Sequence, residues 1–161
     1  MLERLLLDAR ARTELMTRDL DGEHLLGPKL DIVNPPLWEI GHVAWFQERW
    51  CLRTAQGGAP MDSILEGADA LYDSSAVAHD TRWDLPLPGL EATRAYMAEV
   101  LERVRARLAR EPENAALLYY AQLCAFHEDM HAEAFHYTRQ TLGYRDPGAG
   151  APAPLAAAGD E

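Results

Sequence analysis

The chain has 161 residues, a length that suits one domain of ordinary size with a core of its own. Its formal net charge is -11 and its pI is near 4.9, which argues against a surface for nucleic acid or an anionic membrane, because both are polyanions that need clustered lysine and arginine. Small molecules are therefore the expected partners.

The cysteines and the N-terminal segment are typical of a cytoplasmic protein. Cys51 and Cys124 are the only cysteines and form no CxxC motif, so neither a disulfide framework nor a zinc-thiolate site is expected. The first turns carry acidic and basic residues and lack a long apolar core. This segment is therefore expected to be neither a signal peptide nor a membrane span.

Apolar residues at helical spacing predict a first helix over about residues 2–20. Its buried face would consist of Leu2, Leu5, Leu6, Ala9, Thr13, Met16 and Leu20. The charged residues fall off this face, namely Glu3, Arg4, Asp8, Arg10 and Arg12. Glycine and proline then break the helix at 21–28, in a loop where His24 is expected at the surface.

Residues 34–36, Asn-Pro-Pro, predict the start of a second helix, because asparagine caps a helix and proline is tolerated in its first turn. The helix is expected to continue to about residue 53, with Trp38, His42 and Trp45 on one face. Spacing alone leaves two interpretations of His42, a packed core histidine or a metal ligand. Gly41 favours the second, since a glycine inside a helix costs about 1 kcal/mol and usually marks a close approach by another group.

Residues 54–88 form a long connection, and its aromatic residues Tyr72 and Trp83 predict that it is ordered. It contains six acidic residues but a single basic one, Arg82. Two interpretations of the segment around Arg82 stay open. His79, Asp80 and Arg82 could line the mouth of a pocket, or Arg82 could pair with an aspartate and pin the loop.

Two further helices are predicted, over about residues 89–109 and 115–142. The arginines near the end of the earlier helix are most simply a solvated face: Arg103, Arg105, Arg107 and Arg110. The tight connection at 111–114 makes the last helix antiparallel to the one before it, and Gly143 is a good C-cap. Residues 1–146 would form the domain, and residues 147–161, rich in alanine, glycine and proline, a flexible linker.

His127 and His131 lie four residues apart on the inner stripe of the last helix, where they can grip one metal ion. The sequence His127-Glu128-x-x-His131 also matches the zinc-protease motif, in which the glutamate is a general base. Alanine and tyrosine at 134 and 137 break the extended form of that motif, and the expected strands are missing from the pattern. Glu128 is then either a carboxylate that orients a ligand or a surface group.

Four amphipathic helices with a long crossover between the second and third predict an all-α, four-helix bundle. The histidines of the second and fourth helices can meet in its interior. Three imidazoles on one side of an octahedral ion would leave positions for substrate, as in a catalytic site rather than a closed structural one.

The segment from Asn34 to Phe46, together with the histidine pair at 127 and 131, resembles the DinB-like N-terminal domain of the sulfoxide synthases of ergothioneine-type pathways. Within that group, residues 70–88 are most similar to the selenoneine synthases. The resemblance implies a non-haem iron(II), held by His42, His127 and His131, that uses oxygen to join a chalcogen to the imidazole of hercynine. Zinc or another divalent metal is the alternative. The resemblance also implies a C-terminal domain like formylglycine-generating enzyme, which would carry the catalytic tyrosine, so no catalytic residue is expected in this chain.

The expected substrate contacts are Asp80, Arg82, Trp83, Trp45 and Met130. Met130 replaces a glutamine of the sulfur enzymes, and Arg82 stands alone where those enzymes have a pair of arginines for the carboxylates of a peptide thiol. A selenosugar is therefore favoured over a thiol such as gamma-glutamylcysteine. A stand-alone DinB-like thiol transferase and a metal-free helical interaction domain remain the competing functional classes.

Overall fold

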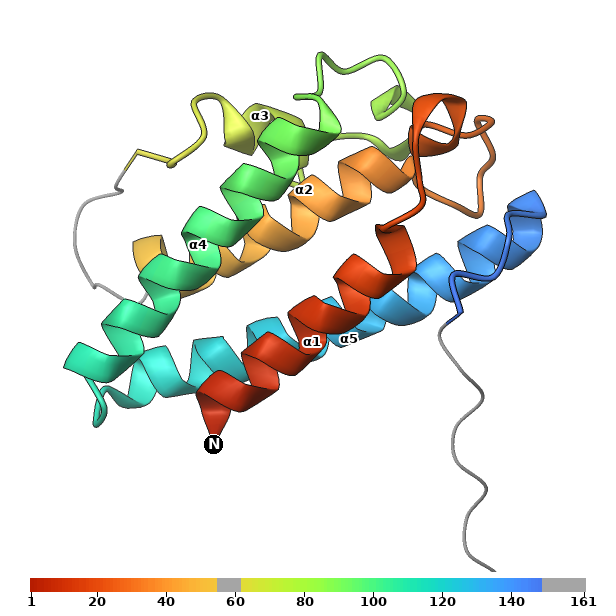
Figure 1. The fold of residues 1–161 in the computed structure, drawn as a ribbon. Coiled ribbons are helices and arrows are strands. Elements are labelled where there is room, and N and C mark those ends of the chain that lie inside the picture. The colour runs from red at the N-terminus through yellow and green to blue at the C-terminus, as the bar shows by residue number, and fades with distance from the viewer. Residues whose placement is uncertain (55–61, 149–161) are drawn as a thin grey trace, which may run out of the picture.

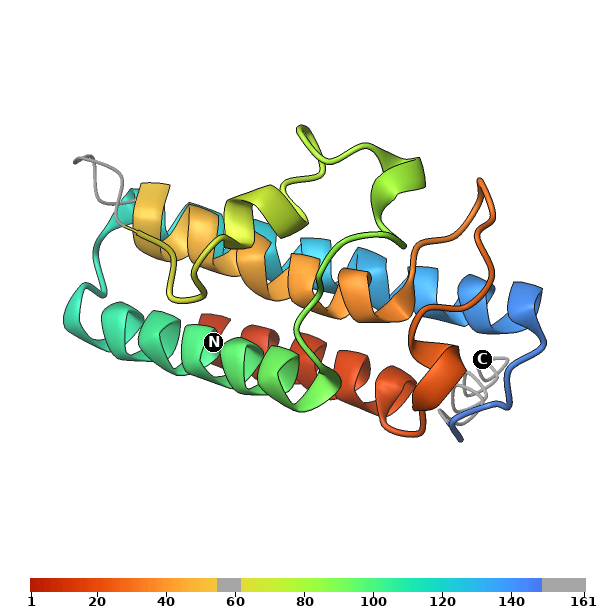
Figure 2. The same ribbon diagram turned by 90° about the horizontal axis from the view of Figure 1, so that it is seen from above.

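The computed structural model describes residues 1–54 and 62–148. Four long helices run side by side: α1 (Leu2–Thr17), α2 (Pro36–Gln47), α4 (Leu90–Arg110) and α5 (Ala115–Leu142). α1 packs mainly on α5, and α2 packs on α4 and α5 (Figure 1). α1 and α5 run in one direction and α2 and α4 in the other, so the connection from α2 to α4 crosses the length of the bundle (Figure 2). The predicted all-α bundle is confirmed, and no strand occurs in the described residues.

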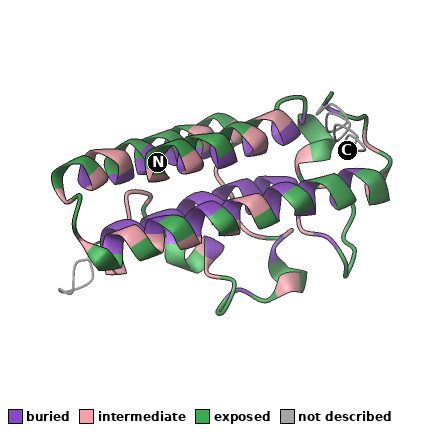
Figure 3. Cartoon of the chain, turned by 90° about the horizontal axis from the view of Figure 1, so that it is seen from below, coloured by how far each residue is buried: buried purple, intermediate pink, exposed green. Residues whose placement is uncertain are grey.

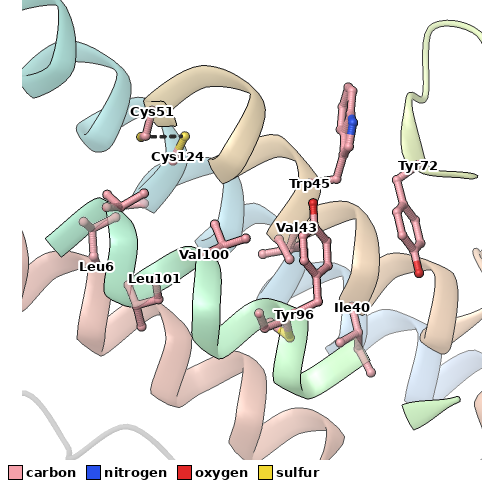
Figure 4. Packing of buried hydrophobic residues seen from close by; sticks show 14 of the residues in the cluster. Leu6, Ile40, Val43, Trp45, Cys51, Tyr72, Tyr96, Val100, Leu101 and Cys124 are labelled. Atoms are coloured by element: carbon pink, nitrogen blue, oxygen red, sulfur yellow. Dashed lines mark hydrogen bonds between the residues drawn. The ribbon is translucent and has the colours of Figure 1, made fainter. Parts of the chain in front are cut away.

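The core lies between the four helices, whose buried faces turn toward one another (Figure 3). Figure 4 shows Ile40 and Val43 of α2 near Tyr96 and Val100 of α4. Of the helices in the described ranges, none combines the length and the apolar character needed to span a bilayer.

The ends of the helices show what local sequence determines. α5 begins and ends where the sequence predicts, because the Asn114 side chain accepts a hydrogen bond from the Leu117 amide and Gly143 ends the helix at a φ of 67°. α1 ends earlier than predicted, at Thr17, although Leu20 is still buried. The predicted cap of α2 is wrong. Pro35 occupies that position, and the Asn34 side chain accepts instead from Arg82.

The second predicted helix changes its winding half-way. It is α-helical to Gln47 and continues as a π-helix, η2 (Glu48–Thr54). Arg107 of α4 donates to the Cys51 carbonyl at 2.7 Å and to the Leu52 carbonyl at 3.4 Å, so it satisfies acceptors that this wider turn presents. Arg107 is therefore buried, at 5% exposure, and is not part of a solvated face.

The connection between α2 and α4 is largely ordered where it is described. It contains a short helix, α3 (Ala68–Tyr72), and a single 3-10 turn, η3 (His79–Thr81), and another such turn, η1 (Gly22–Leu25), precedes α2. Tyr72 is fully buried and Trp83 is half-buried, which agrees with the prediction that this segment is ordered. The glycine-rich stretch at 55–61 and residues 149–161 of the predicted linker lie outside the described residues.

Candidate metal centre

Three histidines from two helices meet inside the bundle. His42 comes from α2, and His127 and His131 come from successive turns of α5. One ring nitrogen from each lies within 4.8 Å of the others, and this is the one cluster of metal-binding side chains found in the described part of the chain. The other described histidines lie elsewhere. His24 and His136 are exposed, and His79 bonds the Val33 carbonyl at 2.7 Å.

The ring of His42 is fixed by its neighbours on both sides. Its Nδ1 lies 2.8 Å from the Tyr72 carbonyl oxygen, and it stacks on Trp38 with ring centroids 4.8 Å apart. Trp45 lies on its other side, with a centroid separation of 5.8 Å. A carbonyl can only accept, so Nδ1 carries the proton and Nε2 keeps its lone pair free.

His131 and His127 direct their Nε2 atoms at each other. His131 Nδ1 lies 2.5 Å from Glu39 Oε1, so the carboxylate accepts the Nδ1 proton and Nε2 is left with a lone pair. The Nε2 atoms of His131 and His127 are 3.2 Å apart. The His127 ring lies flat on Phe46, at a centroid distance of 3.7 Å, and its Nδ1 is buried without a hydrogen-bond partner among the described residues.

Burial keeps the imidazoles of His42 and His127 neutral. Desolvation, followed by the charge of the neighbouring His131, lowers the pKa of His42 to about 4. The same causes, with a contribution from His42, lower the pKa of His127 to about 2. Neutral imidazole is the form that binds a metal ion. Hydrogen bonds fix the tautomers of two rings, and a cation between the three would also accept the facing lone pairs of His127 and His131, so the donor set fits a first-row divalent metal.

α3 accepts hydrogen bonds from the two indole rings of α2. Trp38 Nε1 donates to the Leu71 carbonyl at 2.7 Å, and Trp45 Nε1 donates to Asp69 Oδ1 at 2.6 Å. Arg53 also binds Asp69, at 2.6 Å and 3.0 Å, and these bonds lower the pKa of Asp69 to about 2, with the Arg53 bond the largest cause. Together with the Tyr72 carbonyl, these contacts set the face of α2 that carries His42.

The Arg82 side chain is buried and bonded to other parts of the fold, and it is not open to solvent. Its guanidinium lies 3.8 Å from the centre of the Trp38 ring, and the residue is 9% exposed. It donates to Asn34 Oδ1 at 2.6 Å and to the Val77 carbonyl at 3.3 Å. Arg82 was expected either to line the mouth of a pocket or to pin the loop by pairing with an aspartate. The pinning role fits better, but the partners are an amide and a carbonyl instead of an aspartate.

The other predicted substrate contacts are scattered. Trp45 packs against His42, and Met130 is 54% exposed on α5, next to His131 in sequence. Asp80 is exposed, and the Trp83 indole donates to the carbonyls of residues 26 and 27 at 3.1 Å and 3.2 Å. Neither of these last two contacts the three histidines through a hydrogen bond or ring contact in the described structure.

Two buried acids bind partners that the sequence does not predict. Glu39, the partner of His131, is 1% exposed, and the signal for it was a lone carboxylate in an otherwise apolar helix. Glu128 is also 1% exposed, so it is no surface group, and Arg10 Nε reaches it at 2.7 Å. Arg10, expected off the buried face of α1, is 4% exposed and also donates to the Met97 carbonyl and Gln47. No local spacing could show these pairs, since their members lie 92 and 118 residues apart.

A family model described as the DinB superfamily matches residues 5–135. The chain belongs to the DinB superfamily. This DinB domain is also similar to proteins named hercynine oxygenase. It is 34% identical over 134 residues to the protein of Mycolicibacterium thermoresistibile, which is 82% of this chain and 29% of that protein. It is 30% identical over 125 residues to that of Mycobacterium tuberculosis, again 29% of the relative and 78% of this chain. The DinB domain thus spans less than a third of these relatives.

Proposed function

We propose that this DinB domain is the metal-binding part of a non-haem iron(II), oxygen-dependent enzyme that acts on hercynine. The observation that carries the proposal is the convergence of His42, His127 and His131 within 4.8 Å in a domain similar to hercynine oxygenases. Iron(II) held by these three imidazoles would supply the redox chemistry that such a reaction needs. Zinc or another divalent ion is the alternative metal.

The proposed reaction joins a chalcogen to the hercynine imidazole. A C–H bond of the imidazole and the Se–H bond of a selenosugar are replaced by a C–Se bond. Dioxygen is the oxidant, with one oxygen atom leaving as water and the other ending on selenium. The chain's contribution is to hold the metal and to exclude water, because the rings of Trp38 and Trp45 stack on His42 and the ring of Phe46 stacks on His127.

The positive trimethylammonium group of hercynine suits this side of the bundle. An aromatic face attracts a quaternary ammonium ion, and Trp45 is the candidate because it lies against His42. Trp38 is less suited, since Arg82 already covers its ring. The acidic character of the connection between α2 and α4 would also tolerate a cation.

The chemistry of that connection favours a selenosugar as the donor. A thiol with carboxylates, such as gamma-glutamylcysteine, asks for bidentate arginine. Arg82, the single basic residue of 54–88, is buried and already bonded to Asn34 and Val77. A neutral sugar needs no such partner.

Carbon–sulfur bond formation is the second candidate, because residues 34–46 and the histidine pair resemble the sulfoxide synthases of ergothioneine-type pathways. A competition assay separates the two. The complete enzyme, loaded anaerobically with iron(II), is given oxygen, hercynine and equal amounts of a selenosugar and gamma-glutamylcysteine. We expect the selenium product to dominate. More efficient use of the thiol would reject the selenium assignment in favour of a sulfoxide synthase.

Metal loading tests the first requirement of the proposal, which is that the chain binds a metal ion. If neither iron(II) nor zinc binds at one equivalent per chain, both enzymatic interpretations fail and a helical interaction domain takes their place. Binding of zinc with transfer activity toward thiols, and no reaction with hercynine, would instead support a stand-alone thiol transferase.

A further inference from the structure

α2 supplies the metal centre with a second group besides His42. Glu39 lies three residues before His42 and is the one carboxylate of this helix. Its side chain reaches across to α5, where Oε1 lies 2.5 Å from His131 Nδ1. The same helix thus carries one candidate ligand and holds another in place.

Other buried acids of the chain are better satisfied than Glu39. Glu48 accepts hydrogen bonds from Tyr96 at 2.5 Å and from Ser63 at 2.8 Å, and Arg53 lies 3.6 Å from it. Glu128 accepts from two nitrogens of Arg10. Both acids lie beside a cation, as buried carboxylates require.

Glu39 has no comparable set of partners. The bond to His131 is the one hydrogen bond of the Glu39 side chain to a described residue, and Oε2 is buried with none. The charge of Glu39 acts on Arg82, but the guanidinium directs its bonds to Asn34 and Val77. An unsatisfied buried polar atom costs about 1–3 kcal/mol, and more if charged, so the stability of the bundle alone is a poor reason for this carboxylate.

We propose that Glu39 is a positioning residue for the metal centre. Its hydrogen bond fixes the tautomer and rotation of His131, so that Nε2 faces the ion, and it makes that nitrogen a stronger donor. It also places one negative charge beside a cation whose three ligands are neutral. The Tyr72 carbonyl performs the orienting part of this task for His42, without a charge. The inference rests on the proposed metal site and adds a residue to it.

Two substitutions separate the hydrogen bond from the charge. Glu39→Gln keeps an acceptor oxygen but removes the charge, and Glu39→Leu removes both at similar volume. Glu48→Gln is the matched control, because Glu48 is equally buried on the same helical segment and contacts no histidine in the described structure. Cobalt(II) is the probe, since its visible spectrum reports coordination geometry and its Kd can be measured by competition with a chelator. Urea unfolding of each metal-free protein measures stability separately.

We expect cobalt affinity to fall in the order wild type, Glu39→Gln, Glu39→Leu, with a loss of about 10- to 100-fold for the leucine variant. The cobalt spectrum should change in both, while Glu48→Gln loses stability but keeps the wild-type Kd and spectrum. A Glu39→Gln protein with wild-type affinity and spectrum would overturn the inference, even if Glu39→Leu fails to fold. An equal loss of affinity in Glu48→Gln would assign Glu39 a structural role and overturn it too. A wild-type protein that binds no cobalt, iron or zinc would reject the metal site itself, a result distinct from both.

Discussion

The phenol ring of Tyr72 occupies the space that a side chain at Gly41 would need. A β-carbon built on Gly41 would lie 2.2 Å from Tyr72 Cζ, a distance that no pair of non-bonded carbon atoms tolerates. Tyr72 is also the residue whose carbonyl accepts the hydrogen bond of His42. The missing side chain on α2 and the orientation of a candidate metal ligand are therefore linked through one residue of α3.

Gly41→Ala should damage both stability and metal binding. The added methyl group must push Tyr72 aside, and overpacking of this kind costs about 1–3 kcal/mol. Displacement of the Tyr72 backbone would also loosen His42 and lower metal affinity. Gly89→Ala is the control, because a β-carbon there meets no atom within 4 Å. Urea unfolding and a cobalt titration measure the two effects, and equal behaviour of the two variants would contradict this link.

His127→Ala should abolish stoichiometric iron binding without loss of the fold. Three neutral ligands cannot be reduced to two without a large drop in affinity. The fold should survive, because the His127 ring is only partly buried and its Nδ1 has no hydrogen-bond partner among the described residues. His136→Ala, on the exposed side of α5, is the matched control and should keep its iron. Iron content after anaerobic loading and desalting, with circular dichroism of the same samples, gives the answer. An unchanged iron content in His127→Ala would argue against the assignment.

The buried pair of Arg10 and Glu128 should matter more for stability than its exposed neighbour. Glu128→Ala leaves a guanidinium that is 4% exposed without its carboxylate, and breaking such a buried pair costs about 3–5 kcal/mol. Asp129→Ala breaks a pair with Arg12 whose side chains are 32% and 41% exposed, and surface pairs contribute about 0–1 kcal/mol. Urea midpoints of the two variants provide the comparison. A smaller loss for Glu128→Ala would show that the buried pair does not hold α1 to α5.

The isolated chain should turn over hercynine very slowly, if at all. The DinB domain spans less than a third of the hercynine oxygenases it resembles, and positioning of both substrates against the metal would fall to the rest of such a protein. Product formation by residues 1–161 with iron, oxygen, hercynine and each donor tests this, with a complete hercynine oxygenase as the positive control. Substantial turnover by the isolated chain would show that the DinB domain positions both substrates by itself.

Periodicity predicted the bundle well because its signals are local. The last helix was placed correctly from Asn114 to Gly143, since a cap and a left-handed glycine act within one turn. The three histidines were also predicted to meet, as two lie on one stripe of α5 and the third follows a glycine on α2.

Local sequence patterns could not predict the contacts between segments that lie far apart in the chain. Local spacing gives no role to Glu39, because its partner His131 lies 92 residues away. Arg10 and Arg107 looked like surface charges, because a helical pattern cannot show which carboxylate or carbonyl will be brought to them by packing. The π-helical turn after Gln47 has the same origin, since Tyr96 and Arg107 of α4 and Ser63 of the crossover bond to it.

The most direct test of the metal centre is a crystal structure of the protein loaded anaerobically with iron(II), with anomalous diffraction measured at the iron edge. We predict one iron peak inside the bundle, with the Nε2 atoms of His42, His127 and His131 at about 2.0–2.2 Å, the range of metal–imidazole bonds. Glu39 should still hold His131 Nδ1, and the Tyr72 carbonyl should still hold His42. Iron bound elsewhere, or a loaded crystal with no peak between these three rings, would contradict the account.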